Sequence, residues 1–200
     1  MTVRQVLSAQ PGKHAMTRRV LLRSLIGAAS AAGGLFAFGA ARTVRAQTPA
    51  AALKIELFSA DARSKGVASV ARVIKTEDAW RKQLSAVAYH VAREAGTEAP
   101  FSGEYWNNHA AGLYRCVCCD TALFDSKTKF ESGTGWPSFW KPLSAHNVVE
   151  SVDASLFMKR TAVSCHLCDA HLGHVFDDGP RPTGLRYCMN SVSLKFYAQA

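Results

Sequence analysis

Six cysteines carry the most reactive side chains of this 200-residue chain, and four of them form two pairs with the same spacing. Cys116 and Cys119 form one CxxC pair, and Cys165 and Cys168 form the second. Two intervening residues let a tight turn aim both sulfurs inward, and two such turns complete a tetrahedral thiolate site. The pairs therefore predict one structural zinc ion (Zn2+) per chain, with every ligand supplied by protein.

Disulfide bonds are the competing interpretation of the paired cysteines. A bridge within either CxxC closes a very short loop and adds little stability, whereas bridges between the pairs leave the repeated spacing unexplained. Zinc is therefore the favoured hypothesis.

The stretch LRYCMNSVSL holds Cys188, which belongs to neither pair. Arg186 and Asn190 lie two residues to either side, and such residues share one face of an extended strand. A nearby cation favours the thiolate, which is the nucleophilic form of cysteine. Cys188 is therefore the candidate nucleophile, while Cys118, inside the first CxxC turn, is expected to be a spectator.

Two glycine-rich stretches add further candidates. In GTGWPSFW, the glycines and proline predict a turn that presents Trp136. In AHLGHVFDDGPRPTG, His171 and His174 lie close to Asp178. Two histidines with a carboxylate, in a glycine-rich turn just after a metal pair, are typical of proton-transfer groups.

A helix and several strands are expected to position these residues. KTEDAWRKQLSAVAYHVAREAG predicts a helix capped by Thr76 and ended by Gly96, with a buried face of Trp80, Leu84, Val87 and Val91. Strands are predicted in GLYRCVCCDTALF, HNVVESVDASLFMKRTAVSC and LRYCMNSVSLKFYA, the last with its apolar residues alternating from Val192 to Phe196. The expected fold class is mainly β and antiparallel, with an N-terminal helix and a zinc-knuckle pair.

Residues 1–46 have the features of a cleaved export signal. Arg18 and Arg19 precede an apolar stretch that ends in small residues at Ala46. Its apolar core is shorter than the roughly 20 residues of a membrane-spanning helix, the alternative interpretation. The arginine pair resembles the twin-arginine pattern, which predicts export to a bacterial periplasm. Met16 and Met1 are both candidate start residues.

The charge of the chain depends on that segment. Residues 1–46 hold seven of the 24 basic residues and none of the 15 acidic ones, so the remainder carries +2 rather than +9. The mature chain thus gives no indication of nucleic-acid binding, and no permanent membrane anchor is expected.

Residues 47–75 are interpreted as a lead-in of uncertain order, with a short strand near Leu53–Phe58, before one domain over residues 76–200.

The stretches FSGEYWNNH, YRCVCCDTALF, SGTGWPSFW and CHLCDAHLGHVFDDGPRPTGLRYCMNSVSL together closely resemble the peptide-methionine (R)-S-oxide reductases. These zinc-bearing enzymes reduce the R epimer of methionine sulfoxide. The resemblance runs from about Lys75 to Phe196. It implies a small barrel-like sandwich of two antiparallel sheets, with helices at the N-terminal side.

The resemblance also implies residue roles. Cys188 matches the catalytic cysteine, the four paired cysteines match the zinc ligands, and Trp136 matches the tryptophan that receives the sulfoxide methyl group. The positions that surround the reacting centre in the family are matched here by His171, His174, Asp178, Arg186 and Asn190. The implied reaction is attack of Cys188 on the sulfoxide sulfur of an oxidised protein, protonation of the oxygen by imidazolium from His171 or His174, and formation of a sulfenic acid.

One position departs from the family pattern. Many relatives have a resolving cysteine where this chain has Thr134. Either Cys118 takes that role, or an external reductant such as a thioredoxin-like protein attacks Cys188 directly; the second is favoured.

Two other functions compete with this interpretation of the chain. One is a non-catalytic zinc-ribbon binding module, which leaves Cys188 and the histidines without a role. The other is a thiol oxidoreductase, which needs one CxxC free of metal.

Overall fold

The computed structural model describes residues 51–154 and 159–199, all within one compact unit of residues 46–200. The interpretation of residues 1–46 as an export signal lies outside the described residues and stays a prediction. In the described ranges, no helix has the length and apolar character needed to cross a bilayer.

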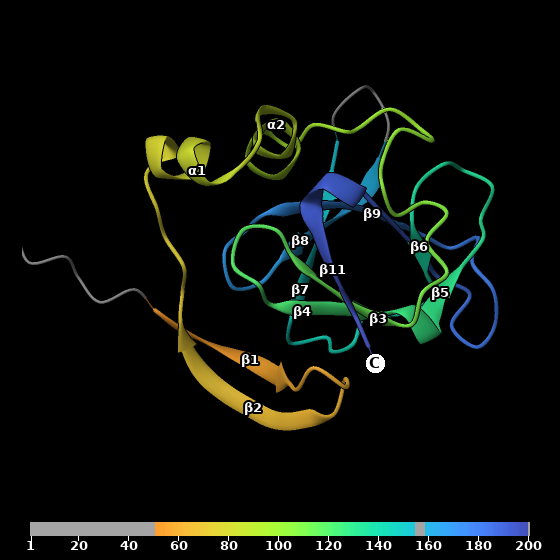
Figure 1. Cartoon of the computed structure of the whole chain (residues 1–200), viewed down its shortest axis with the longest axis horizontal. Coiled ribbons are helices and arrows are strands. Elements are labelled where there is room, and N and C mark those ends of the chain that lie inside the picture. The colour runs from red at the N-terminus through yellow and green to blue at the C-terminus, as the bar shows by residue number, and fades with distance from the viewer. Residues whose placement is uncertain (1–50, 155–158, 200) are drawn as a thin grey trace, which may run out of the picture. The chain divides into compact units, whose positions relative to one another are not determined.

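The described strands form three antiparallel sheets (Figure 1). The largest has the order β5-β6-β10-β9-β8-β7 and comprises Lys129–Phe130 (β5), Ser138–Phe139 (β6), Val148–Asp153 (β7), Arg160–Cys165 (β8), His171–Phe176 (β9) and Arg186–Met189 (β10). The second, β11-β3-β4, comprises Gly112–Cys116 (β3), Ala122–Asp125 (β4) and Leu194–Ala198 (β11). The third is a hairpin of Ala52–Phe58 (β1) and Ser64–Ala71 (β2). The mainly β, antiparallel fold is confirmed.

Aromatic packing joins the two larger sheets. Phe124 of β4 stacks on Phe139 of β6 with ring centroids 4.5 Å apart, and Tyr114 of β3 meets Phe139 edge-on at 5.0 Å. All three rings are fully buried. Each such ring removes roughly 150–250 Å² of surface from water, which makes this contact a major part of the core. It fixes the sheet that carries β9 and β10.

The predicted single helix is two helices, Glu77–Gln83 (α1) and Ala86–Glu94 (α2). Thr76 caps α1 as predicted, but Ser85 is extended and its hydroxyl caps a second helix. A second cap in mid-pattern therefore divides the segment. The break changes which face is buried, so Val87, predicted to be in the core, is 56% exposed. Helix α2 packs against β9 and the turn before β11.

The predicted alternation after Cys188 is also interrupted. Ser191–Ser193 form a 3-10 turn, and both serines are buried rather than exposed. The buried carboxylate of Glu98 accepts hydrogen bonds from the N–H groups of Ser191 and Val192, at 2.6 and 3.0 Å. A distant side chain thus satisfies these backbone donors, which local sequence cannot indicate.

The lead-in contains more structure than expected. The strand predicted near Leu53–Phe58 is present as β1, but its partner β2 was not predicted. The side-chain amide of Asn147 binds both the N–H and the carbonyl of Glu56, each at 2.9 Å, and Ile55 enters the core. The hairpin is thereby joined to the rest of the domain.

Candidate functional site

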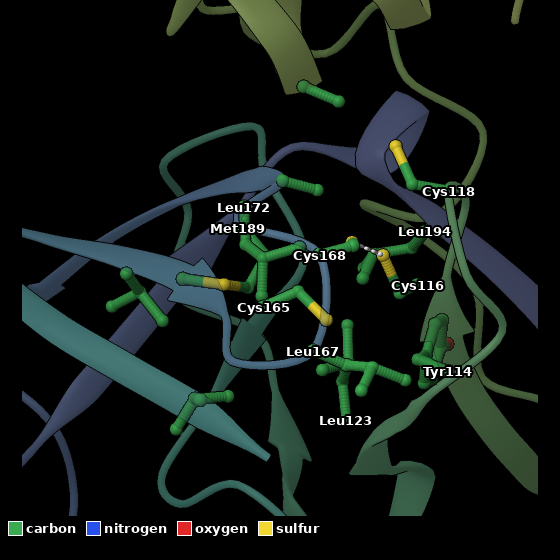
Figure 2. Packing of buried hydrophobic residues seen from close by; sticks show 14 of the residues in the cluster. Tyr114, Cys116, Cys118, Leu123, Cys165, Leu167, Cys168, Leu172, Met189 and Leu194 are labelled. Carbon is green, nitrogen blue, oxygen red and sulfur yellow. Dashed lines mark hydrogen bonds between the residues drawn. The ribbon is translucent and has the colours of Figure 1, made fainter. Parts of the chain in front are cut away.

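The four paired cysteines come together between the two larger sheets. Their Sγ atoms all lie within 4.8 Å of one another, with Cys116 and Cys168 3.6 Å apart and Cys119 and Cys165 3.5 Å apart. Figure 2 shows Cys116, Cys165 and Cys168 near one another, with a dashed line between the sulfurs of Cys116 and Cys168. A tetrahedral zinc with Zn–S bonds of about 2.3 Å holds its sulfurs about 3.8 Å apart. The cluster therefore fits a metal ion, and the predicted convergence of the two CxxC pairs is confirmed.

The two CxxC turns are built alike. After each pair an aspartate, Asp120 or Asp169, adopts positive φ (64° and 57°). The N–H of that aspartate donates to the carbonyl of the first cysteine, Cys116 or Cys165, at 2.9 Å. Aspartate tolerates this left-handed conformation better than most residues. The repeated local sequence thus produces two equivalent turns that face each other.

Cys188 lies on β10, between β6 and β9, opposite Ser138 and His174. It is partly buried at a cavity of about 110 Å³, which is lined by Thr97, Trp136, Arg160, Gly173, His174, Phe176, Cys188 and Asn190. A Cβ at Gly173 would lie 2.1 Å from the carbonyl oxygen of Cys188, so only glycine allows β9 to approach β10 this closely. The structure thus brings Cys188, Trp136, His174 and Asn190 to one cavity.

Burial raises the pKa of the Cys188 thiol above its ordinary value. A hydrogen bond with Thr134, at 3.8 Å, and the charge of Arg186 lower the pKa but do not outweigh burial. Arg186 thus favours the thiolate, as expected from the sequence, but desolvation penalises the charged form more strongly. The resting group is a thiol that must lose its proton before it attacks.

Arg186 and Asp178 form a bidentate ion pair, with both hydrogen bonds at 2.8 Å. The guanidinium also lies 4.4 Å from the Phe176 ring centroid. The hydrogen bond to Arg186 lowers the pKa of Asp178 and raises that of the guanidinium, so both groups are charged. Neither Asp178 nor Arg186 lines the cavity; Arg186 affects it through its charge near Cys188 and its contact with Phe176.

The two histidines lie on strand β9, not in the glycine-rich turn that was expected. Their rings meet edge-on with centroids 5.3 Å apart. Burial lowers the pKa of His171 to about 4, and His174 adds to the effect, so His171 is neutral at pH 7. Its Nε2 is buried without a hydrogen-bond partner. His171 is therefore a poor source of imidazolium, whereas His174 lines the cavity and donates from Nε2 to Asp153 at 2.8 Å.

Trp136 is held in place by the segment that follows α2. Its Nε1 donates to the carbonyl of Glu98 at 3.2 Å, and the carbonyl of Gly135 accepts from the N–H of Phe101 at 2.8 Å. Gly135 has φ of +89°, which an L residue adopts only with strain. The predicted turn therefore presents the indole to the cavity that holds Cys188.

Asn190 is 3% exposed, and its amide is used for backbone contacts. Its Nδ2 donates to the carbonyl of Leu172 at 3.1 Å, and its Oδ1 accepts from the N–H of Glu98 at 3.0 Å. These bonds tie the segment after Cys188 to β9 and to the segment that holds Trp136.

Thr134 and Cys118 lie in different surroundings. The Thr134 hydroxyl is beside the Cys188 sulfur, where a resolving thiol would be expected. Cys118 is buried next to the four-sulfur cluster (Figure 2). It is not among the residues that line the Cys188 cavity.

The residues at or behind the cavity that were not singled out in the sequence include Thr97, Glu98, Asp153 and Arg160. Glu98 ties Trp136 to the turn after Cys188, and Asp153 binds His174. Their spacing in the sequence gives no sign that they lie near the cysteines or histidines. Strand register and a loop of irregular structure bring them to the cavity that holds Cys188.

Residues 84–198 match the SelR domain family. A peptide methionine sulfoxide reductase MsrB of Herminiimonas arsenicoxydans is 58% identical over 127 residues, which are 64% of this chain and 93% of that protein. The MsrB of Hahella chejuensis is 54% identical over 127 residues, covering 64% of this chain and 91% of that protein. The chloroplastic peptide methionine sulfoxide reductase B1 of Oryza sativa subsp. japonica is 60% identical over 121 residues, covering 60% of this chain and 56% of that protein.

Proposed function

This chain belongs to the SelR-domain family of peptide methionine sulfoxide reductases, and we propose that it reduces methionine-R-sulfoxide in peptides and proteins, with Cys188 as the nucleophile. It is an oxidoreductase that acts on a sulfur group. The residue assignment depends on the cavity, which is lined by the thiol of Cys188, the indole of Trp136 and the imidazole of His174.

The reaction begins with a proton transfer, because burial favours the thiol form of Cys188. His174 takes that proton, and the thiolate attacks the sulfoxide sulfur. The imidazolium then protonates the sulfoxide oxygen. The hydroxyl then passes from the methionine sulfur to the Cys188 sulfur: the substrate S–O bond and the S–S bond formed in the attack both break, a new S–O bond forms on Cys188, and methionine leaves. The oxygen has moved from methionine to Cys188, which is now a sulfenic acid.

Selectivity for the R epimer follows from the two sides of the cavity. Trp136 offers an apolar wall for the methyl group, while Arg160 and, once it has taken the proton from Cys188, His174 place polar donors elsewhere in the lining. In the S epimer, the methyl group and the oxygen exchange places, so an oxygen would face the indole and donors would face a methyl group. Leaving buried donors unpaired in this way is costly.

An external thiol regenerates the enzyme. Thr134 cannot form a disulfide, and Cys118 packs beside the four-sulfur cluster. One thiol attacks the Cys188 sulfenic acid and releases water, and a second thiol releases Cys188 as the external disulfide forms. A thioredoxin-like protein or another thiol reductant fits this role.

The ion in the four-cysteine cluster is zinc, and its role is structural. The four Sγ atoms lie within 4.8 Å of one another, and tetrahedral thiolate coordination is typical of closed zinc sites. Bound zinc would hold the two CxxC turns together. Elemental analysis of purified protein is expected to find one zinc per chain, and a metal-free folded protein would contradict this assignment.

The enzyme repairs exported proteins in the periplasm. Arg18 and Arg19, followed by the apolar segment, support export by the twin-arginine route. Cell fractionation and N-terminal sequencing are expected to find mature protein that begins near Gln47 in the periplasm. Cytoplasmic retention of the complete chain would contradict this.

The decisive assay compares peptides that carry R or S methionine sulfoxide, with dithiothreitol as the reductant. Turnover is expected for the R peptide alone and is expected to vanish in Cys188→Ser. Turnover that survives in Cys188→Ser would overturn the assignment, and a protein inert toward both peptides would favour a binding module.

A further inference from the structure

Asp153 lies at the end of β7, next to the cavity that holds Cys188. Its Oδ2 accepts a hydrogen bond from His174 Nε2 at 2.8 Å and another from Arg160 at 2.8 Å. The three side chains are 21%, 11% and 23% exposed. Strand β8 separates β7 from β9, so Asp153 reaches His174 across one strand. Burial makes such charge-assisted hydrogen bonds stronger than they are at an open surface.

The hydrogen bond determines which nitrogen of His174 carries the proton. An ionised carboxylate only accepts hydrogen bonds, so Nε2 of His174 must bear the hydrogen. In the neutral imidazole, Nδ1 is then the acceptor. Asp153 thus leaves the second ring nitrogen able to take up a proton.

Cys188 is placed to supply that proton. It is directly opposite His174 in the antiparallel β9–β10 pair. Side chains of such opposed residues lie on one face with Cβ atoms roughly 4.5–5.5 Å apart. Both residues line the same cavity. Strand β10 thus contributes the thiol of Cys188, β9 the imidazole of His174 and β7 the carboxylate of Asp153.

We propose that Asp153 is a positioning residue for this reaction, which holds His174 in the Nε2–H tautomer so that Nδ1 carries the proton from Cys188 to the sulfoxide oxygen. The inference rests on the proposed function. Arg160, which ion-pairs with Asp153 at 2.8 Å, helps to hold the carboxylate beside the imidazole. The Nε2 proton stays in place throughout, and the charge of Asp153 stabilises the imidazolium formed between the two transfers.

Neighbouring charged groups have other partners. Asp178 is bound to Arg186, and Glu150 accepts a hydrogen bond from the Tyr187 hydroxyl at 2.7 Å. His171 contacts the His174 ring but is neutral at pH 7. Asp153 is therefore the described carboxylate best placed to orient His174.

The test compares Asp153→Asn with Asp153→Glu and with a matched control, Asp177→Asn, which removes an exposed carboxylate beside the end of β9. Each variant is assayed with the R-sulfoxide peptide and dithiothreitol. Asp153→Asn is expected to lower kcat at least tenfold while KM changes less than threefold. Asp153→Glu restores most of kcat, and Asp177→Asn matches the wild-type chain. General acid–base catalysis is typically worth about 10²–10⁴-fold, so loss of its orienting group must be visible.

Nitrogen NMR of labelled histidine measures the tautomer of His174 directly. The tautomer would not change if Asp153 had only a structural role. Wild-type His174 is expected as the Nε2–H tautomer, and Asp153→Asn is expected to lose that preference. An Nδ1–H tautomer in the wild-type chain overturns the inference even where Asp153→Asn does not fold. Unchanged kcat in Asp153→Asn overturns it too, whereas a wild-type chain inert toward the R-sulfoxide overturns the proposed function instead.

Discussion

Replacing His171 by glutamine is expected to make the stability of the domain less dependent on pH. Burial lowers the pKa of His171 to about 4, from 6.5 in an exposed histidine. Between these two values the unfolded chain binds a proton that the folded chain excludes. The stability that neutral His171 provides is therefore fully present above pH 6.5 and is lost as pH falls toward 4. The full pKa shift of His171 corresponds to about 3 kcal/mol of unfolding free energy, because one pKa unit is equivalent to about 1.4 kcal/mol.

The assay is urea unfolding of both proteins at pH 7 and pH 5, with saturating zinc present. Staying at or above pH 5 limits protonation of the cysteine cluster, which would release metal. Over this range His171 accounts for about 2 kcal/mol of lost stability. The wild-type chain is expected to lose that much more than His171→Gln, while carboxylates common to both proteins cancel. Equal losses, or an NMR titration of His171 near 6.5, would refute this description of a buried neutral histidine.

Three further predictions concern the cavity. Trp136→Ala is expected to reduce the preference for the R epimer roughly tenfold or more, since a methyl group in an apolar pocket is worth about 1–3 kcal/mol; kcat/KM for both epimers checks this. Thr134→Cys is expected to yield a disulfide with Cys188 after one turnover, because the Thr134 hydroxyl is 3.8 Å from that sulfur; peptide mapping that finds a lasting sulfenic acid would contradict it. Arg186→Met removes a charge that lowers the pKa of Cys188, so the pKa rises further. Alkylation of Cys188 at a fixed pH below that pKa is then expected to slow about tenfold per pKa unit, whereas an unchanged pH profile would show that Arg186 does not act on the thiol.

The sequence predicts most strongly those features that local spacing determines. The two CxxC turns, the Thr76 cap and the short strands around the cysteines all follow from patterns a few residues long. The division of the helix at Ser85 was missed, because one apolar periodicity continues across the break while the hydroxyl caps a new helix.

Residues positioned by tertiary structure could not be found in this way. Asp153 is 21 residues from His174 in the chain, and only the order of strands β7, β8 and β9 brings them together. The net effect on the pKa of Cys188 could not be predicted for a related reason. Its neighbour Arg186 is visible in the sequence, but the burial that outweighs that charge is a property of the folded sheet.

The measurement that bears most directly on the central claim is a single-turnover trapping experiment. Reduced protein is mixed with one equivalent of an R-sulfoxide peptide, without reductant, and treated with a reagent specific for sulfenic acids before peptide mapping. The predicted result is one methionine formed per chain and a label on Cys188 alone. Stoichiometric methionine with the label on Cys118 or another cysteine, and Cys188 unmodified, would contradict the assignment of Cys188 as the nucleophile.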